Sequence, residues 1–145
     1  MFTRIFGTTT EEIKQAAEII KEGGLVAFPT ETVYGLGAEA VGKVYAAKGR
    51  PSDNPMIVHI SSKDDVIKLT PEITEDMQEL MDEFWPGPLT MVVPALGIIP
   101  KVTTGGLDTV GIRMPSEPAA AELISAAETP IAAPSANLSG KPSPT

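Results

Sequence analysis

The chain reads Thr9-Thr-Glu-Glu-Ile-Lys-Gln-Ala-Ala-Glu-Ile-Ile-Lys-Glu-Gly-Gly-Leu-Val-Ala-Phe28 near its start, and this stretch combines a helix signal with a buried-strand signal. Thr9 and Glu12 have the spacing of a capping box, in which each side chain satisfies a free backbone N–H at a helix start. Apolar residues then recur on one helical face, and Gly23-Gly24 ends the helix as C-caps do. The apolar residues 25–28 predict a short buried strand. A helix followed directly by such a strand indicates an α/β protein.

The rest of the sequence continues this alternation. We expect further strands at 56–60, 89–93, 108–113 and 131–133, and further helices at Val41–Lys48, from the N-cap Thr70 through the apolar stripe Ile73–Phe84, and at Ser116–Glu128. No repeat, low-complexity tract or linker interrupts the pattern. Residues 1–145 are therefore predicted to form a single domain with an α/β sheet.

The composition excludes several kinds of site. The 145 residues are 42% hydrophobic and 21% charged, which is ordinary for a globular domain. Cysteine is absent, so there is no disulfide, thiol nucleophile or cysteine-ligated metal, and the single histidine excludes a multi-histidine metal site. No secretory signal or membrane-spanning apolar run is present, so we expect a cytoplasmic location and no membrane partner.

The net charge of −8 argues against non-specific nucleic-acid binding by the whole surface. A local basic patch remains compatible with this charge. Lys43, Lys48 and Arg50 lie close together in a chain with only 11 basic residues, so this cluster is a candidate for binding an anion.

Polar segments follow two of the predicted strands. Pro29-Thr-Glu-Thr-Val-Tyr-Gly-Leu-Gly37 comes directly after residues 25–28, and Pro134-Ser-Ala-Asn-Leu-Ser-Gly140 follows residues 131–133. Ligands of open α/β sheets collect beyond the carboxyl ends of strands, so both segments are candidate pocket walls. Their hydroxyls could instead cap their own backbone, and for the first segment the residues alone slightly favour that alternative. The chain contains no glycine-rich phosphate-binding fingerprint or Walker A motif.

Two further segments carry candidate anion-binding cations. Lys48-Gly-Arg-Pro-Ser-Asp-Asn-Pro55 places an ammonium and a guanidinium two residues apart, a suitable pair for phosphates or carboxylates. A solvated surface turn is the more common role of an isolated Lys-Gly-Arg. Gly111-Ile-Arg-Met-Pro115 ends a strand with Arg113, which is either exposed to solvent or a ligand clamp. His59, inside a predicted strand, is either hydrogen-bonded within the structure or a base that needs an orienting carboxylate.

The residues and the order of five motifs resemble those of the YrdC-like threonylcarbamoyl-AMP synthase family. The motifs are Pro-Thr-Glu-Thr-Val-Tyr-Gly-Leu-Gly, Lys-Gly-Arg-Pro-Ser-Asp-Asn-Pro with Ile-Val-His-Ile, Trp-Pro-Gly-Pro-Leu-Thr, Val-Gly-Ile-Arg-Met-Pro, and Pro-Ser-Ala-Asn-Leu-Ser-Gly. The similarity runs from about Thr9 to Thr145. It implies a twisted open mixed sheet with flanking helices around a deep, positively lined cavity, a YrdC/RibB-like fold.

The resemblance also implies a reaction and a site. Threonine and bicarbonate form a carbamate, which attacks the α-phosphorus of ATP, with Mg²⁺, and releases pyrophosphate; the threonylcarbamoyl-AMP product supplies a downstream tRNA-modifying transferase complex. The residues that the resemblance places in this site are Lys48, Arg50, Ser135 and Asn137 as the central catalytic and nucleotide-binding tetrad, Ser139 along the nucleotide, and Thr30, His59 and Arg113 around threonine or its carbamate.

The chain departs from this family pattern in two places. The segment between Gly37 and Lys48 is shorter than usual, and the sequence stops at Thr145, before the strands that complete the nucleotide site. We therefore expect a domain truncated at its C-terminal end. Two other functions remain open: a carbamoyl-adenylating domain of the hydrogenase-maturation type, and a double-stranded-RNA-binding module. The charge of −8 weighs against the second and against tight tRNA binding by this domain alone.

Overall fold

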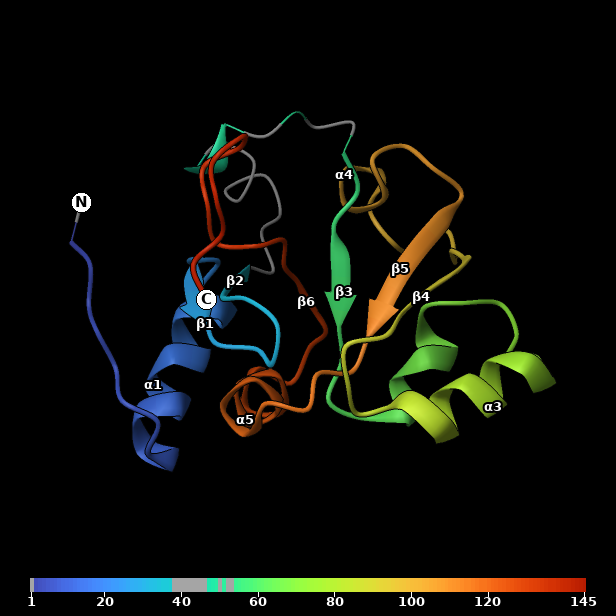
Figure 1. Ribbon diagram of the computed structural model, residues 1–145, viewed down its shortest axis with the longest axis horizontal. Helices are drawn as coiled ribbons and strands as arrows, with labels where there is room; N and C mark the ends of the chain where they lie inside the picture. The colour runs from blue at the N-terminus through green and yellow to red at the C-terminus, as the bar shows by residue number, and fades with distance from the viewer. Residues whose placement is uncertain (1, 38–46, 50, 52–53) are drawn as a thin grey trace.

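The computed structural model describes residues 2–37, 47–49, 51 and 54–145 and has a mixed α/β fold (Figure 1). The strands are β1 (Val26–Phe28), β2 (Gly35–Gly37), β3 (Ile57–His59), β4 (Thr90–Pro94), β5 (Thr109–Arg113) and β6 (Ile131–Ala132). The helices are α1 (Thr10–Lys21), the 3₁₀ helix η1 (Lys63–Lys68), α3 (Glu75–Phe84), α4 (Lys101–Thr104) and α5 (Pro118–Ala127). No helix in the described ranges is long and apolar enough to cross a membrane.

Helix α1 begins and ends where the sequence predicts. The Thr9 hydroxyl accepts a hydrogen bond from the N–H of Glu12 at 3.3 Å, and the Glu12 carboxylate accepts one from the N–H of Gly7 at 2.5 Å. The carboxylate thus binds a backbone N–H two residues before the cap rather than that of the cap itself. Gly23 follows the helix with a φ of 79°, a left-handed conformation that glycine adopts at little cost.

The predicted start of α3 at Thr70 is wrong. Thr74 is the N-cap, and its hydroxyl accepts a hydrogen bond from the N–H of Met77 at 3.3 Å. Thr70 is instead buried, and its hydroxyl has no partner among the residues that the structure describes. The expected apolar stripe is also narrower than predicted, because Leu80 and Phe84 are 40% and 51% exposed.

The remaining predicted elements are confirmed within one or two residues, with one exception. Of the expected helix Val41–Lys48, residues 41–46 lie outside the described residues, and only the last two are seen, in helical conformation. The sequence did not predict β2 or α4 as elements of their own. Trp85 packs in the core, and its indole N–H donates to the carbonyl of Leu89 at 2.8 Å.

The four-stranded sheet has the order β4-β5-β3-β6, and β1 and β2 form a separate antiparallel pair. Strands β3 and β5 are parallel, with His59 opposite Arg113, whereas β4 and β6 run antiparallel to them. The carboxyl ends of β3 and β5 therefore meet at one edge of the sheet, where both arrowheads lie in Figure 1. The mixed sheet that the resemblance implied is confirmed.

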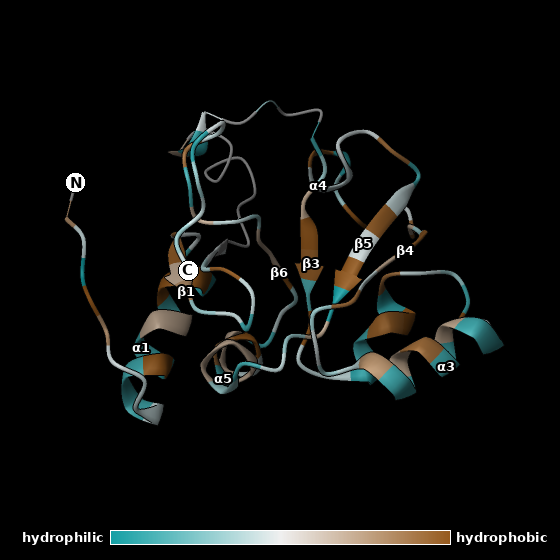
Figure 2. Cartoon of the chain, in the orientation of Figure 1, coloured by the Kyte–Doolittle hydropathy of each residue, from teal (hydrophilic) through white to brown (hydrophobic). Residues whose placement is uncertain are grey.

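Two apolar clusters hold the fold together. One lies between α1, α5, β1 and β6, and the other packs η1 and α3 against β3, β4 and β5. Figure 2 shows hydrophobic residues concentrated along β3 and β5 and forming stripes on α3. The second cluster packs against the central strands β3 and β5, which holds the residues at their ends in place.

Candidate functional site

Two charged or titratable side chains lie at the shared carboxyl end of β3 and β5. His59 and Arg113 are opposite each other in the parallel register and are only 4% and 7% exposed. The N–H of Ile60 donates to the carbonyl of Arg113 at 3.0 Å and continues the pairing beyond the last strand residue. This is the position in which open α/β sheets bind ligands.

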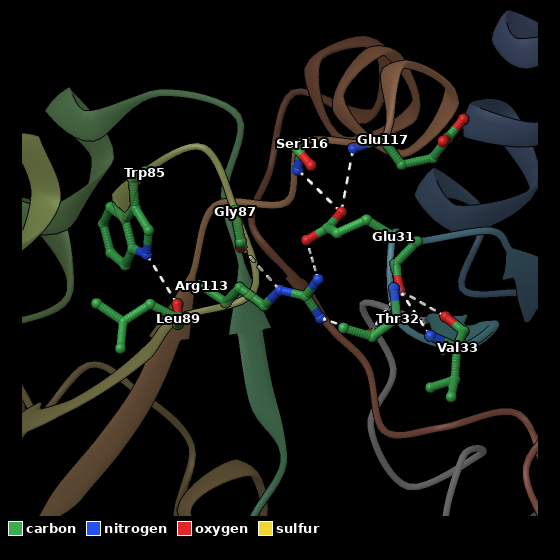
Figure 3. A network of polar contacts seen from close by, with 10 residues as sticks. Glu31, Thr32, Val33, Trp85, Gly87, Leu89, Arg113, Ser116 and Glu117 are labelled. Carbon is green, nitrogen blue, oxygen red and sulfur yellow. Dashed lines mark hydrogen bonds and ion pairs between the residues drawn. The ribbon is translucent and has the colours of Figure 1, made fainter. Parts of the chain in front are cut away.

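The guanidinium of Arg113 is held by two loops (Figure 3). Its Nε–H donates to the carbonyl of Gly87 at 3.1 Å, and one Nη donates to the hydroxyl of Thr32 at 3.2 Å. The other Nη forms a salt bridge with Glu31. Arg113 is therefore not exposed to solvent, and the first of the two sequence interpretations is wrong.

The carboxylate of Glu31 uses both oxygens. One binds Arg113, and the other accepts the N–H groups of Ser116 and Glu117 at 3.0 and 3.1 Å, just before α5 begins. Burial raises the pKa of this carboxyl, but the hydrogen bond and positive charge of Arg113 together with backbone hydrogen bonds outweigh burial, so the pKa is lowered overall. Glu31 is therefore ionised at neutral pH and balances the charge of the guanidinium.

His59 is held in the neutral state beside this pair. Burial lowers its pKa to about 4, and the positive charge of Arg113 acts in the same direction. Its Nδ1 lies 3.1 Å from the carbonyl of Ile57, which accepts a hydrogen bond in the tautomer with the proton on Nδ1. The ring of Phe28 packs edge-on against the imidazole, with centroids 6.1 Å apart. The imidazole therefore offers hydrogen bonds rather than a positive charge.

The hydroxyl of Thr30 is engaged within its own loop. It donates to the carbonyl of Val33 at 2.5 Å and accepts from the N–H groups of Thr32 and Val33 at 3.2 to 3.3 Å. The self-capping alternative is thus confirmed for this part of the segment. The role of Thr30 in binding threonine stays a prediction.

A second group of predicted residues gathers around Lys48. This lysine is 4% exposed, and its ammonium donates to the carbonyls of Ser135 and of Asn137, the latter at 2.5 Å. The N–H of Ser139 donates to the carbonyl of Lys48 at 3.0 Å. Three members of the predicted tetrad and Ser139 are therefore brought together, whereas Arg50 lies outside the described residues. The deep, positively lined cavity that the resemblance implies stays a prediction.

The side chain of Asn137 orders the loop that presents these groups. Its amide N–H groups donate to the carbonyls of Leu138 and Lys141 at 3.0 and 2.8 Å, and its side-chain oxygen accepts from the hydroxyls of Ser135 and Ser143. These bonds fold the segment after β6 into a compact turn. The serine and the asparagine of the motif therefore contact each other as the resemblance implied.

The two groups are connected through the β1–β2 hairpin. Gly35 of β2 forms an isolated bridge with Ser135, and the N–H of Ala136 donates to the carbonyl of Tyr34 at 2.8 Å. The loop that carries Glu31 and the loop that binds Lys48 are thus adjacent along one hairpin. Each group contributes one buried cation, an arrangement suited to a ligand with two anionic parts.

Sequence reasoning missed Glu31 and Thr32. It considered their segment as a pocket wall but assigned a role only to Thr30. A signal was available, because an arginine that ends a buried strand needs a carboxylate partner and Glu31 directly follows another strand. In the described ranges no group of three or more histidine, cysteine, aspartate or glutamate side chains could hold a metal ion.

Known proteins similar to this chain include threonylcarbamoyl-AMP synthases, as the sequence motifs indicated. Threonylcarbamoyl-AMP synthase of Pyrococcus abyssi is 57% identical over 139 residues, which cover 92% of this chain and 41% of that relative. A structure of P. abyssi Sua5 complexed with L-threonine superimposes with a TM-score of 0.92 at 55% identity, and covers 99% of this chain and 43% of the other. The chain thus spans less than half the length of these relatives.

A structure of full-length HypF in a phosphate- and nucleotide-bound form matches with a TM-score of 0.79 over 91% of this chain and 21% of the other. At 24% identity this likeness shows the shared fold alone. The Sua5_yciO_yrdC family model, described as Telomere recombination, matches residues 18–145, most of the sequence. The chain belongs to the Sua5/YciO/YrdC family.

Proposed function

We propose that this chain is the catalytic domain of a threonylcarbamoyl-AMP synthase, which converts threonine, bicarbonate and ATP to threonylcarbamoyl-AMP and pyrophosphate. The observation that carries the proposal is the pairing of neutral His59 with Arg113 at the carboxyl ends of β3 and β5. Such a pair suits the carboxylate and hydroxyl of a small amino acid. The match to P. abyssi Sua5, whose structure contains L-threonine, supports this choice of ligand.

The reaction needs positioning and charge compensation more than a protein nucleophile. The threonine nitrogen adds to the carbon of bicarbonate, and loss of water gives a carbamate. An oxygen of the carbamate then attacks the α-phosphorus of ATP, and the bond from that phosphorus to the bridging oxygen breaks to release pyrophosphate. Lys48, with its ammonium fixed by two carbonyls, compensates negative charge on the phosphates.

The guanidinium of Arg113 holds the carboxylate of threonine in this scheme, and His59 and Thr30 contact its other polar groups. We assign nucleotide binding to four further residues, namely Arg50, Ser135, Asn137 and Ser139. Mg²⁺ enters with ATP as part of the substrate, and we assign it no protein ligand. The product then passes to a tRNA-modifying transferase; direct tRNA binding by this acidic chain is weak or absent, and a cytoplasmic location stays our expectation.

Pyrophosphate release tests the proposal most directly. The assay compares ATP alone with ATP plus threonine, plus bicarbonate, and plus both, and mass spectrometry identifies the adenylate. Lys48→Ala should abolish release, whereas Lys14→Ala, an exposed lysine on α1, should retain it. Circular dichroism of both variants establishes that they are folded.

The possible outcomes separate the competing functions. Release that requires both co-substrates supports the synthase. If this chain releases no pyrophosphate but a C-terminally extended chain does, the 145 residues are an incomplete catalytic unit. If neither chain releases pyrophosphate, the synthase proposal fails. Turnover of carbamoyl phosphate would then support the carbamoyl-adenylating domain, and salt-sensitive RNA binding would support the RNA-binding module.

A further inference from the structure

Glu31 connects three parts of the fold at the site. It lies in the loop between β1 and β2, binds the guanidinium at the end of β5, and accepts two backbone N–H groups just before α5. Its side chain is 22% exposed, so water has limited access to the pair. Figure 3 shows the carboxylate between the guanidinium on one side and Ser116 and Glu117 on the other. The position of this carboxylate is therefore fixed from both directions.

Some N–H groups of Arg113 donate to the protein, and others are available to a ligand. A guanidinium has five N–H groups. Nε and each of the two Nη atoms donate once, to Gly87, Thr32 and Glu31. One N–H on each Nη has no partner in the described part of the chain. Two N–H groups on the terminal nitrogens are what a carboxylate accepts.

Arginine has a long side chain with large rotamer freedom, so these two donors are aimed only if the guanidinium is held. The Gly87 carbonyl fixes the Nε edge but leaves the plane of the group free to tilt. Glu31 and Thr32 bind the two terminal nitrogens and remove that freedom. Glu31 provides the charged one of these two bonds, which is the stronger.

We propose that Glu31 is a positioning residue for substrate binding: it orients the guanidinium of Arg113 toward the carboxylate of threonine and ties that orientation to the start of α5. The inference rests on the proposed function for the identity of the ligand. The fixed orientation itself follows from the contacts of Glu31. Glu31 touches no reacting atom in this scheme and acts through Arg113.

The central test is Glu31→Gln, which keeps the size of the side chain. Its amide has one acceptor oxygen, so it cannot serve both Arg113 and the N–H groups before α5. We expect the KM for threonine to rise about tenfold, the order that follows loss of a hydrogen bond to a charged group. The KM for ATP should stay within about twofold, since the ATP phosphates are assigned to the Lys48 group.

Glu12→Gln is the matched control. The Glu12 carboxylate also accepts a backbone N–H at a helix start, but it lies on α1 and binds no arginine among the residues that the structure describes. This variant should leave both KM values unchanged. An unchanged threonine KM in Glu31→Gln, or an equal rise in both KM values, would overturn the proposal, because the first shows no role and the second shows general damage.

A double-mutant cycle with Arg113→Lys tests whether Glu31 acts through Arg113 or affects threonine binding independently. If Glu31 acts through the guanidinium, Glu31→Gln adds little in the Arg113→Lys background. A further tenfold rise in the threonine KM when Glu31→Gln is added to Arg113→Lys would contradict the proposal. Should Glu31→Gln fail to fold, Glu31→Asp takes its place, and a threonine KM between those of the wild type and Arg113→Lys is expected.

Nitrogen NMR of the arginine Nε–H gives a readout that does not require catalysis. The Arg113 signal, assigned by its loss in Arg113→Lys, should be sharp in the wild type because Nε–H is buried and bonded to Gly87. It should broaden or exchange faster in Glu31→Gln and not in Glu12→Gln. If neither this chain nor a C-terminally extended chain releases pyrophosphate, the proposed function fails. The NMR signal then tests the positioning role by itself, and an unchanged Arg113 signal in Glu31→Gln refutes that role.

Discussion

Lowering the pH should destabilise this protein through His59. The folded protein holds this imidazole neutral, with a pKa lowered to about 4 by burial and by the charge of Arg113. An unfolded chain takes up the proton near its ordinary pKa of 6.5. Between these values the unfolded state binds more protons than the folded state. The stabilising contribution of the neutral imidazole is therefore complete above about pH 6.5 and declines as the pH falls toward 4.

The expected magnitude follows from the difference between the two pKa values. At 1.36 kcal/mol per unit, the whole contribution is about 3 kcal/mol, of which about 2 kcal/mol is lost between about pH 7 and pH 5. Urea denaturation followed by fluorescence of Trp85, the one tryptophan in the chain, measures the free energy of unfolding at each pH. His59→Gln provides the reference, because it retains every other titrating group.

His59 is also the one histidine, so its proton resonances can be followed without assignment of the rest of the chain. They should not titrate between about pH 8 and pH 5 while the protein is folded. A midpoint near pH 6.5 would refute the burial argument directly. Equal pH dependence of stability in the wild type and in His59→Gln would refute the linkage argument, since the loss would then come from carboxylates such as Glu31.

The same urea assay checks three predictions about the fold. Thr74→Ala should cost about 1 kcal/mol because it removes the N-cap of α3, whereas Thr70→Val should be neutral or stabilising because it removes a buried hydroxyl without a partner in the described residues. Ile20→Ala should lower the free energy of unfolding by about 2–5 kcal/mol, since this side chain of α1 is fully buried in the cluster with α5. A decrease below about 1 kcal/mol would contradict that packing. Gly37→Ala should cost about 1–3 kcal/mol, because a Cβ there would lie 2.7 Å from side chains of β1 and β6, and Gly97→Ala, which meets open space, should stay within about 0.5 kcal/mol.

Local sequence signals predicted the elements that have strong periodicity or caps. Helix α1 combines a capping box, an apolar face and a terminal glycine, so its limits follow from the sequence within a residue. Thr70-Pro71 offered a similar start for α3, yet Thr74 is followed by two acidic residues in the first turn, which also favour a helix N-terminus. The choice between them depends on which threonine the core buries, and this is a tertiary effect.

Elements without a local pattern could not be predicted. Strand β2 is Gly-Leu-Gly, and it exists because its backbone pairs with β1. The glycine at position 37 fits there because Phe28 and Ile131 occupy the space of a side chain. Such a close approach between β2 and two other strands is set by packing and leaves no signal in the neighbouring residues.

The sequence identified some of the residues that the structure brings together, but not the contacts between them. The motifs identified Lys48, Ser135 and Asn137, which the structure brings together, and placed His59 and Arg113 near one ligand. The role of Glu31 depends on hydrogen bonds to residues more than 80 positions away in the sequence. A single sequence contains no information on such pairs beyond the requirement that a buried arginine has an acceptor.

The burial of two cations in an acidic chain argues for function rather than stability. Lysine and arginine are rarely buried, and moving either from water into the protein costs several kcal/mol even after relaxation. The carbonyls around Lys48 and the carboxylate of Glu31 offset part of that cost, but well-packed apolar side chains would be as stable or more so. A bound anion changes this comparison, because it meets charges that are already desolvated and oriented. The burial of Lys48 and Arg113 is therefore better explained by the binding of a ligand with negative charge than by a gain in stability.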